Sequence, residues 1–121
     1  MRVMIVDDQP RMRAVIRDAV ATVCHEIIEC GGGAEALEAY ATARPDWVTM
    51  DYRMEPMDGF QATTALKQRY PGARVLIVTN YDEAELRAAA LEAGADGFVL
   101  KEDVSTLPQL LTEGLTGCGG R

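Results

Sequence analysis

The sequence has little cysteine and little positive charge, and both scarcities exclude whole classes of protein. Its three cysteines, Cys24, Cys30 and Cys118, are an odd number without a CxxC spacing, so they favour neither a disulfide framework nor a zinc site. Twelve basic residues face nineteen acidic ones, and the net charge is -7. Because no run of Lys or Arg offers a surface for a phosphate backbone, we expect no direct nucleic-acid binding by this domain.

Long apolar runs are also missing. No stretch approaches the roughly eighteen apolar residues of a membrane span, and the N-terminus, MRVMIVDDQP, reaches two aspartates before a signal sequence could form. We therefore expect a cytoplasmic protein without a membrane segment. Its 121 residues, 48% hydrophobic and 26% charged, are typical of one globular domain that folds alone.

What the sequence does contain is a fivefold alternation of short apolar runs with segments of helical period. Buried parallel strands are apolar throughout, and the runs of this kind are 2–6, 26–30, 47–51, 74–79 and 97–100. Parallel neighbours need crossover connections, which are right-handed. The sequence therefore predicts an α/β fold, a doubly wound five-stranded parallel sheet with strand order 2-1-3-4-5.

Capping residues and helix breakers delimit the helices between these strands. Pro10 suits the first turn of the first helix, and Asp58 is expected to cap the third. Asp82, with Glu85 three residues later, predicts a capping box at the start of the fourth helix, which ends at Gly94. The helices are expected at about 12–23, 34–43, 59–70 and 82–93, and from Thr106, with Leu107, Leu110, Leu111 and Leu115 on one face.

Five reactive side chains follow the ends of the predicted strands. Asp7 and Asp8 follow the first, Asp51 closes the third, Thr79 closes the fourth, and Lys101 follows the fifth. Ligands of doubly wound sheets bind outside the carboxyl ends of the strands. We therefore expect these five side chains to converge on one site.

The residue types at this site indicate phosphoryl chemistry. Three carboxylates this close would raise one another's pKa unless a cation neutralised them. Oxygen-only ligation suits Mg²⁺, which also takes an oxygen of a phosphoryl group. Asp51 can then act as the nucleophile that forms an acyl phosphate, while Lys101 and Thr79 supply a positive charge and a hydroxyl donor.

Four motifs carry a family resemblance: IVDDQ at 5–9, MDYRMEPMDG at 50–59, VTNYDE at 78–83 and AGADGFVLKED at 93–103. Together they resemble the response-regulator receiver domains of two-component systems, and the resemblance spans residues 1–115, with 116–121 as a flexible tail or the start of a linker. It implies a flavodoxin-like (βα)5 fold and a histidine kinase that phosphorylates Asp51. It also implies that Asp8, Asp51 and the backbone carbonyl of Arg53 ligate Mg²⁺, with Asp7 acting through a metal-bound water.

The same resemblance implies how the signal leaves the site. Thr79 and Phe98 would form a switch pair, in which the hydroxyl moves toward the phosphoryl group and the ring turns inward behind it. The output surface would be the fourth helix, fifth strand and fifth helix, and a homodimer through this face is expected. Receivers of this kind assist their own phosphorylation and hydrolysis but are not turnover enzymes. The sequence of residues 81–103 is most similar to that of receivers that precede a helix-turn-helix domain.

Four residues depart from the commonest family pattern. Glu55 and Glu102 stand where proline is usual, and Asn80 stands where a small residue is frequent. Because a cis bond before a residue other than proline costs about 2.5–4 kcal/mol, no cis peptide is assumed after Lys101. Phe98 lacks the hydroxyl of the frequent tyrosine, so its switching would rest on packing alone.

Three further interpretations stay open. Arg53 and Tyr81 each follow a site residue by two positions, so they are expected to border the phosphoryl pocket and to tune dephosphorylation. A small Asp-nucleophile phosphatase is the rival enzyme, although its DxDx[TV] signature is absent after Asp51. A degenerate receiver that only binds proteins is the rival interaction module. His25, the one histidine, is expected at the surface and not in a phosphorelay.

Overall fold

Five parallel strands form one sheet in the order β2-β1-β3-β4-β5, which confirms the predicted topology. The computed structural model describes residues 1–113. The strands are β1 (Arg2–Val6), β2 (Glu26–Cys30), β3 (Trp47–Asp51), β4 (Val75–Thr79) and β5 (Gly97–Leu100). Only β4 differs from its predicted bounds, by one residue at its start. All residues of β3 and β4 are buried, as expected for central parallel strands.

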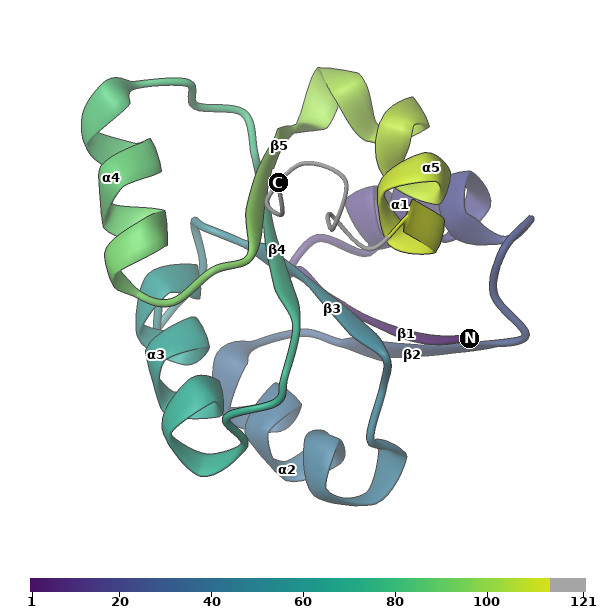
Figure 1. Ribbon diagram of the computed structural model, residues 1–121, viewed down its shortest axis with the longest axis horizontal. Helices are drawn as coiled ribbons and strands as arrows, with labels where there is room; N and C mark the ends of the chain where they lie inside the picture. The colour runs from purple at the N-terminus through teal and green to yellow at the C-terminus, as the bar shows by residue number, and fades with distance from the viewer. Residues whose placement is uncertain (114–121) are drawn as a thin grey trace.

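Helices cover both faces of this sheet (Figure 1). They are α1 (Pro10–Val20), α2 (Gly33–Ala43), α3 (Gly59–Arg69), α4 (Ala84–Glu92) and α5 (Leu107–Glu113), and a 3-10 helix, η1 (Lys101–Thr106), precedes α5. No helix within residues 1–113 is long and apolar enough to cross a membrane. Because helices cover both faces, the sheet has a hydrophobic layer on each side.

The alternation of side chains along β1 shows how the two layers are divided. Val3 and Ile5 point into the layer under α1 and α5, which also holds Trp47 and Leu107. Met4 and Val6 point into the other layer, where α2, α3 and α4 contribute small and apolar residues. Successive side chains of a strand face opposite ways, so a strand buried on both faces is apolar at every position.

The third helix begins as the sequence predicted. Asp58 Oδ1 accepts a hydrogen bond from the Gln61 backbone N–H at 2.9 Å, and Gln61 Oε1 accepts one from the Asp58 N–H at 2.9 Å. This reciprocal capping box satisfies two otherwise unpaired donors of the first turn. Asp58 is therefore a structural residue, and the prediction of an N-cap is confirmed.

The predicted start of the fourth helix is wrong, whereas its predicted end is confirmed. The N-cap is Glu83, and Asp82 Oδ1 instead accepts a hydrogen bond from Arg87 Nε at 2.6 Å. The later start places Asp82 outside the position from which a capping box can form. At the other end Gly94 has a φ of 98°, and the N–H of Gly94 and the N–H of Ala95 close a Schellman motif.

The last helix starts one residue after its predicted position. Leu107 and Leu111 are buried and Leu110 is partly buried, which confirms three residues of the predicted apolar face. Leu115 lies outside the described residues, as do the predicted domain boundary at 115 and the predicted tail, 116–121.

Candidate functional site

The carboxyl ends of β1, β3, β4 and β5 bring the five predicted site residues to one edge of the sheet. Asp7 directly follows β1, and its N–H donates to the carbonyl of Cys30 at 3.1 Å, so the pairing of β1 with β2 extends into the site. Asp51 and Thr79 are the last residues of β3 and β4. Asp7, Asp51 and Thr79 are all buried, because each belongs to the end of a central strand.

The three carboxylates form one cluster. Asp7, Asp8 and Asp51 each offer one oxygen atom, and these atoms lie within 4.8 Å of one another. Asp8 is exposed, whereas the other two are buried. The cluster therefore opens toward solvent at Asp8 and is closed behind Asp7.

Lys101 is the cation that faces this cluster. Its Nζ lies 3.2 Å from Asp51 Oδ1 and 3.4 Å from Asp7 Oδ2. One ammonium group thus pairs with two buried carboxylates, and the site keeps an excess of negative charge.

The excess of negative charge affects the pKa of Asp51. Burial and, after it, the charge of Asp7 raise the pKa of Asp51, Lys101 lowers it, and the net result is a pKa of about 6. The three effects act in the directions expected for desolvation, like charge and opposite charge. The ionised form of Asp51 is therefore destabilised unless a further cation approaches.

One oxygen atom of the cluster accepts no hydrogen bond within residues 1–113, although Lys101 lies near it. Asp7 Oδ1 accepts a hydrogen bond from the Gln9 N–H at 2.9 Å, but Asp7 Oδ2 is buried and finds no hydrogen-bond partner among the described residues. Buried polar atoms are ordinarily paired, and an exception points to an ion or a water molecule. An oxygen-only set of carboxylates with a buried oxygen that accepts no hydrogen bond fits Mg²⁺.

A cavity of about 260 Å³ lies beside the carboxylate cluster. Its lining residues are Gln9, Asp51, Arg53, Thr79, Asn80, Tyr81 and Lys101. Asp51 is the one carboxylate of the cluster in this lining. The cavity therefore presents a carboxylate, an ammonium group and a hydroxyl group to the same small volume.

Arg53 and Tyr81 both line this cavity, which confirms the expectation that they border the pocket. The guanidinium carbon of Arg53 lies 4.9 Å from the centre of the Tyr81 ring, a cation–π contact. The Tyr81 N–H donates to Thr79 Oγ1 at 3.2 Å, so the hydroxyl hydrogen of Thr79 is available to another acceptor.

The backbone of Asp51 is held by the start of α3. The N–H of Gly59 donates to the carbonyl of Tyr52 at 2.8 Å. A Cβ atom at Gly59 would overlap the main-chain oxygen of Asp51 and would lie 2.9 Å from its carbonyl carbon. Only glycine permits this close approach, which packs the helix against the end of β3.

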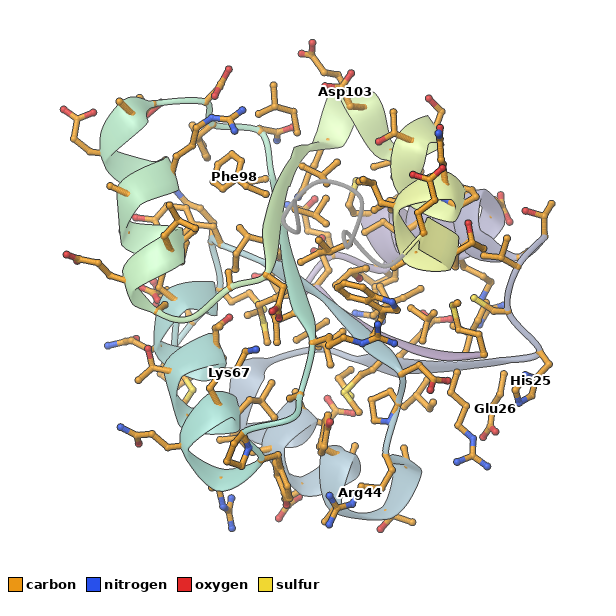
Figure 2. All side chains as sticks on the ribbon, viewed as in Figure 1. His25, Glu26, Arg44, Lys67, Phe98 and Asp103 are labelled. Carbon is orange, nitrogen blue, oxygen red and sulfur yellow. The ribbon has the colours of Figure 1, made fainter. Side chains whose placement is uncertain are left out.

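Phe98 lies apart from the cavity. Its ring is partly buried between β5 and α4 (Figure 2), in a separate pocket of about 210 Å³ that Arg87 also lines. The guanidinium carbon of Arg87 lies 4.5 Å from the centre of the ring. The structure thus brings together all predicted site residues except Phe98.

The departures at Glu55 and Glu102 also have structural outcomes. Within residues 1–113 the cis peptide bond is that between Glu55 and Pro56, so the bond from Lys101 to Glu102 is trans. Lys101 opens η1 and still reaches the carboxylates from this backbone. A proline after Lys101 is therefore not required to place its ammonium group.

A family model for the response regulator receiver domain matches residues 3–112. The chain belongs to the response regulator receiver family. Receiver domains are the phosphoryl-accepting domains of two-component systems, and they are not enzymes in the ordinary sense. The family assignment agrees with the resemblance carried by the four sequence motifs.

Two relatives illustrate the range of proteins that contain such a receiver. The chain is 37% identical to the chemotaxis protein CheY of Bacillus subtilis over 101 residues, which are 83% of this chain and 84% of that protein. It is 39% identical to the response regulator protein VraR of Staphylococcus aureus over 103 residues, which are 83% of this chain and 49% of that protein. The chain thus spans most of the first relative and about half of the second.

Solved structures share the arrangement of the receiver. A LuxR-family two-component response regulator from Aurantimonas sp. SI85-9A1 superposes with a TM-score of 0.87 at 33% identity, covering 96% of this chain and 85% of that one. The chemotaxis protein CheY4 of Vibrio cholerae gives 0.85 at 26% identity, with 93% and 96% covered. The CheY4 structure agrees with the strand order of this receiver.

Sequence reasoning missed two residues around the site. Gln9 lines the cavity, and its position immediately after the acidic pair was a usable signal. Arg13 lies behind Asp7, and its Nη1 donates to the Asp7 main-chain carbonyl at 2.6 Å. No local pattern marks Arg13, because its contacts come from the residue after β1 and from β2.

Proposed function

We propose that this receiver accepts a phosphoryl group on Asp51 from a histidine kinase in a Mg²⁺-dependent reaction. The observation that carries the proposal is the position of Asp51. It is the one carboxylate of the cluster in the cavity lining, and it shares that lining with Lys101 and Thr79. Asp7 and Asp8 then serve the metal, and Asp51 serves both the metal and the phosphoryl group.

The proposed transfer makes one bond and breaks another. An oxygen of the Asp51 carboxylate attacks the phosphorus of a phosphohistidine, the new O–P bond forms, and the P–N bond breaks with its electron pair leaving on the imidazole. Lys101 faces the charge on the phosphoryl oxygens, and Thr79 donates its hydroxyl hydrogen to one of them. Bound Mg²⁺ supplies positive charge that neutralises the carboxylates and the phosphoryl oxygens.

The residues proposed to hold Mg²⁺ are Asp8, Asp51 and the backbone carbonyl of Arg53, with Asp7 contributing through a water molecule. Two observations support this assignment: Asp7 Oδ2 is buried and accepts no hydrogen bond among the described residues, and the three carboxylates lie close together. Water that reaches the acyl phosphate would hydrolyse it, so slow autodephosphorylation is the expected activity, and turnover of free phosphate esters is not.

The proposed output is a change at α4, β5 and α5. Thr79 and Phe98 are the proposed switch pair, and Arg87 connects the Phe98 ring to Asp82 in the loop after Thr79. Leu91 on α4 is 71% exposed and offers an apolar contact on this face. We propose that the face binds a second receiver or an output domain in the cytoplasm, and that it serves transcription regulation where a DNA-binding domain is present.

Labelling with acetyl phosphate tests the proposed function without a kinase. The wild type should gain one phosphoryl group, measured by intact mass, only when Mg²⁺ is present. Asp51→Asn should abolish the labelling, and Asp58→Asn should leave it intact, because Asp58 only caps α3. Equal labelling of Asp51→Asn and the wild type would contradict the proposal.

A further inference from the structure

Arg13 fixes the loop that carries the acidic pair, although it touches neither side-chain carboxylate in the contacts described. Its Nη1 donates to the main-chain carbonyl of Asp7 at 2.6 Å. This carbonyl belongs to the peptide group that joins Asp7 to Asp8. Because a rotation of that peptide would turn both residues, a bond to its oxygen controls the direction of two carboxylates at once.

Arg13 is itself held firmly. Its Nε donates to Glu29 Oε1 at 3.0 Å, and Glu29 lies on β2 beside the site strand β1. The side chain of Arg13 is 19% exposed. The guanidinium group therefore makes an ion pair with Glu29 through one nitrogen and a hydrogen bond to the Asp7 carbonyl through another. A planar group with several N–H donors can make both contacts at once.

A neighbouring arginine provides a natural comparison. Arg17 also pairs with Glu29, from the next turn of α1, but its side chain is 54% exposed. The described contacts of Arg17 do not include the Asp7 carbonyl. Exposed ion pairs contribute little to stability, so the two arginines share a partner and differ in their connection to the site.

We propose that Arg13 is a positioning residue for the Mg²⁺-binding carboxylates, acting through the Asp7 carbonyl. The inference rests on the proposed function, since it concerns the same metal site. Partners that orient metal ligands from outside the ligand set typically change metal affinity about 10- to 100-fold when they are lost. Arg13 occupies that place for the loop of Asp7 and Asp8.

Positioning and simple charge make opposite predictions for this residue. Removal of a cation near an acidic cluster should strengthen the binding of Mg²⁺ if only charge matters, because repulsion between the two cations is lost. If Arg13 acts by orienting the loop, its removal should weaken the binding. The sign of the change in affinity therefore separates the two effects.

Isothermal titration calorimetry of the purified protein with MgCl₂ at pH 8 measures the sign of this change in affinity. Arg13→Ala should weaken Mg²⁺ binding about tenfold or more, and Arg13→Lys, which keeps a long donor, should regain most of the loss. Arg17→Ala, the matched control, should bind as the wild type does. Urea unfolding of each variant shows whether it is folded. If Arg13→Ala is not, Arg13→Met decides, because it keeps the apolar stem and removes both the charge and the donor; weaker binding by Arg13→Met than by Arg17→Ala supports the proposal.

Two results would contradict the inference in distinguishable ways. Equal or tighter binding by Arg13→Ala, or by Arg13→Met in its place, with a wild type that binds Mg²⁺, would overturn the role of Arg13 alone. A wild type that binds no Mg²⁺ would overturn the proposed function and this inference with it.

Discussion

Lys101 Nζ lies 3.2 Å from Asp51 Oδ1, and yet the pKa of this carboxyl is raised to about 6. Burial of Asp51 and the charge of Asp7 together outweigh the attraction of the single ammonium group. Ionisation of Asp51, the proposed phosphoacceptor, therefore lowers the stability of the metal-free folded receiver. This effect leads to a prediction about stability and pH.

Asp51→Asn is expected to stabilise the metal-free receiver at pH 8. The ordinary pKa of the carboxyl is 3.8, and the folded value is about 6. Above pH 6 the group is ionised in both states, and the folded state is penalised by up to about 3 kcal/mol. As the pH falls from 6 to below 3.8 the penalty disappears, so the gain from Asn should shrink to near zero.

Urea unfolding in EDTA at several pH values between 8 and 3.5 measures this difference against the wild type. Asp58→Asn is the control, because asparagine caps a helix about as well as aspartate does. A gain that stays the same at every pH, or a loss of stability at pH 8, would show that the raised pKa is not the cause.

Gly59→Ala is expected to destabilise the receiver strongly. The added methyl group would overlap the main-chain oxygen of Asp51 and lie 3.0 Å from the Tyr52 Cα, so α3 and the end of β3 would have to separate. We expect a loss of about 3 kcal/mol or more in the free energy of unfolding. Gly72→Ala, where no described atom lies within 4 Å of the added group, should change it by less than about 0.5 kcal/mol. Similar urea midpoints for the two variants would refute the close packing.

Arg87→Ala should release the ring of Phe98. Loss of the cation–π contact should lower stability by about 0.5–1 kcal/mol and should move the ¹⁹F resonance of fluorophenylalanine at Phe98. The resonance of Phe60, which stacks on Tyr52, should not move. Asp82→Asn weakens only the ion pair of Arg87 and should shift the Phe98 resonance less. An unmoved Phe98 resonance in Arg87→Ala would argue against the contact.

The contact of Arg53 with Tyr81 is expected to slow the hydrolysis of the acyl phosphate by covering the cavity. The double variant Arg53→Ala, Tyr81→Ala should shorten the phosphoryl lifetime roughly two- to fivefold, which corresponds to the energy of one exposed cation–π contact. Arg44→Ala is the matched control, because Arg44 makes the same kind of contact over Tyr70 at 4.9 Å. An unchanged lifetime in the double variant would remove the tuning role.

The strands and the acidic site could be predicted because both follow from short stretches of sequence. Asp7, Asp51 and Thr79 each end or follow an apolar run, and the parallel sheet itself brings strand ends together. The start of α4 was predicted wrongly because Asp82 could either cap a helix or pair with Arg87, and the second option depends on the ring of Phe98 lying beneath that arginine.

The support behind the site could not be predicted for a related reason. Arg13 lies on α1 and Glu29 on β2, sixteen positions apart. Their meeting depends on how α1 packs over the sheet, which no local pattern encodes. Residues at strand ends were therefore predictable, whereas residues that join two packed elements were not.

The most direct test of the central claim is to locate the phosphoryl group after labelling with acetyl phosphate and Mg²⁺. Borohydride reduces the acyl phosphate and so converts the labelled aspartate to homoserine. Peptide mass spectrometry then identifies the position of the homoserine. We predict modification at Asp51 and none at Asp7 or Asp8. Modification of Asp7 or Asp8 instead, with Asp51 intact, would contradict the assignment of Asp51 as the phosphoacceptor.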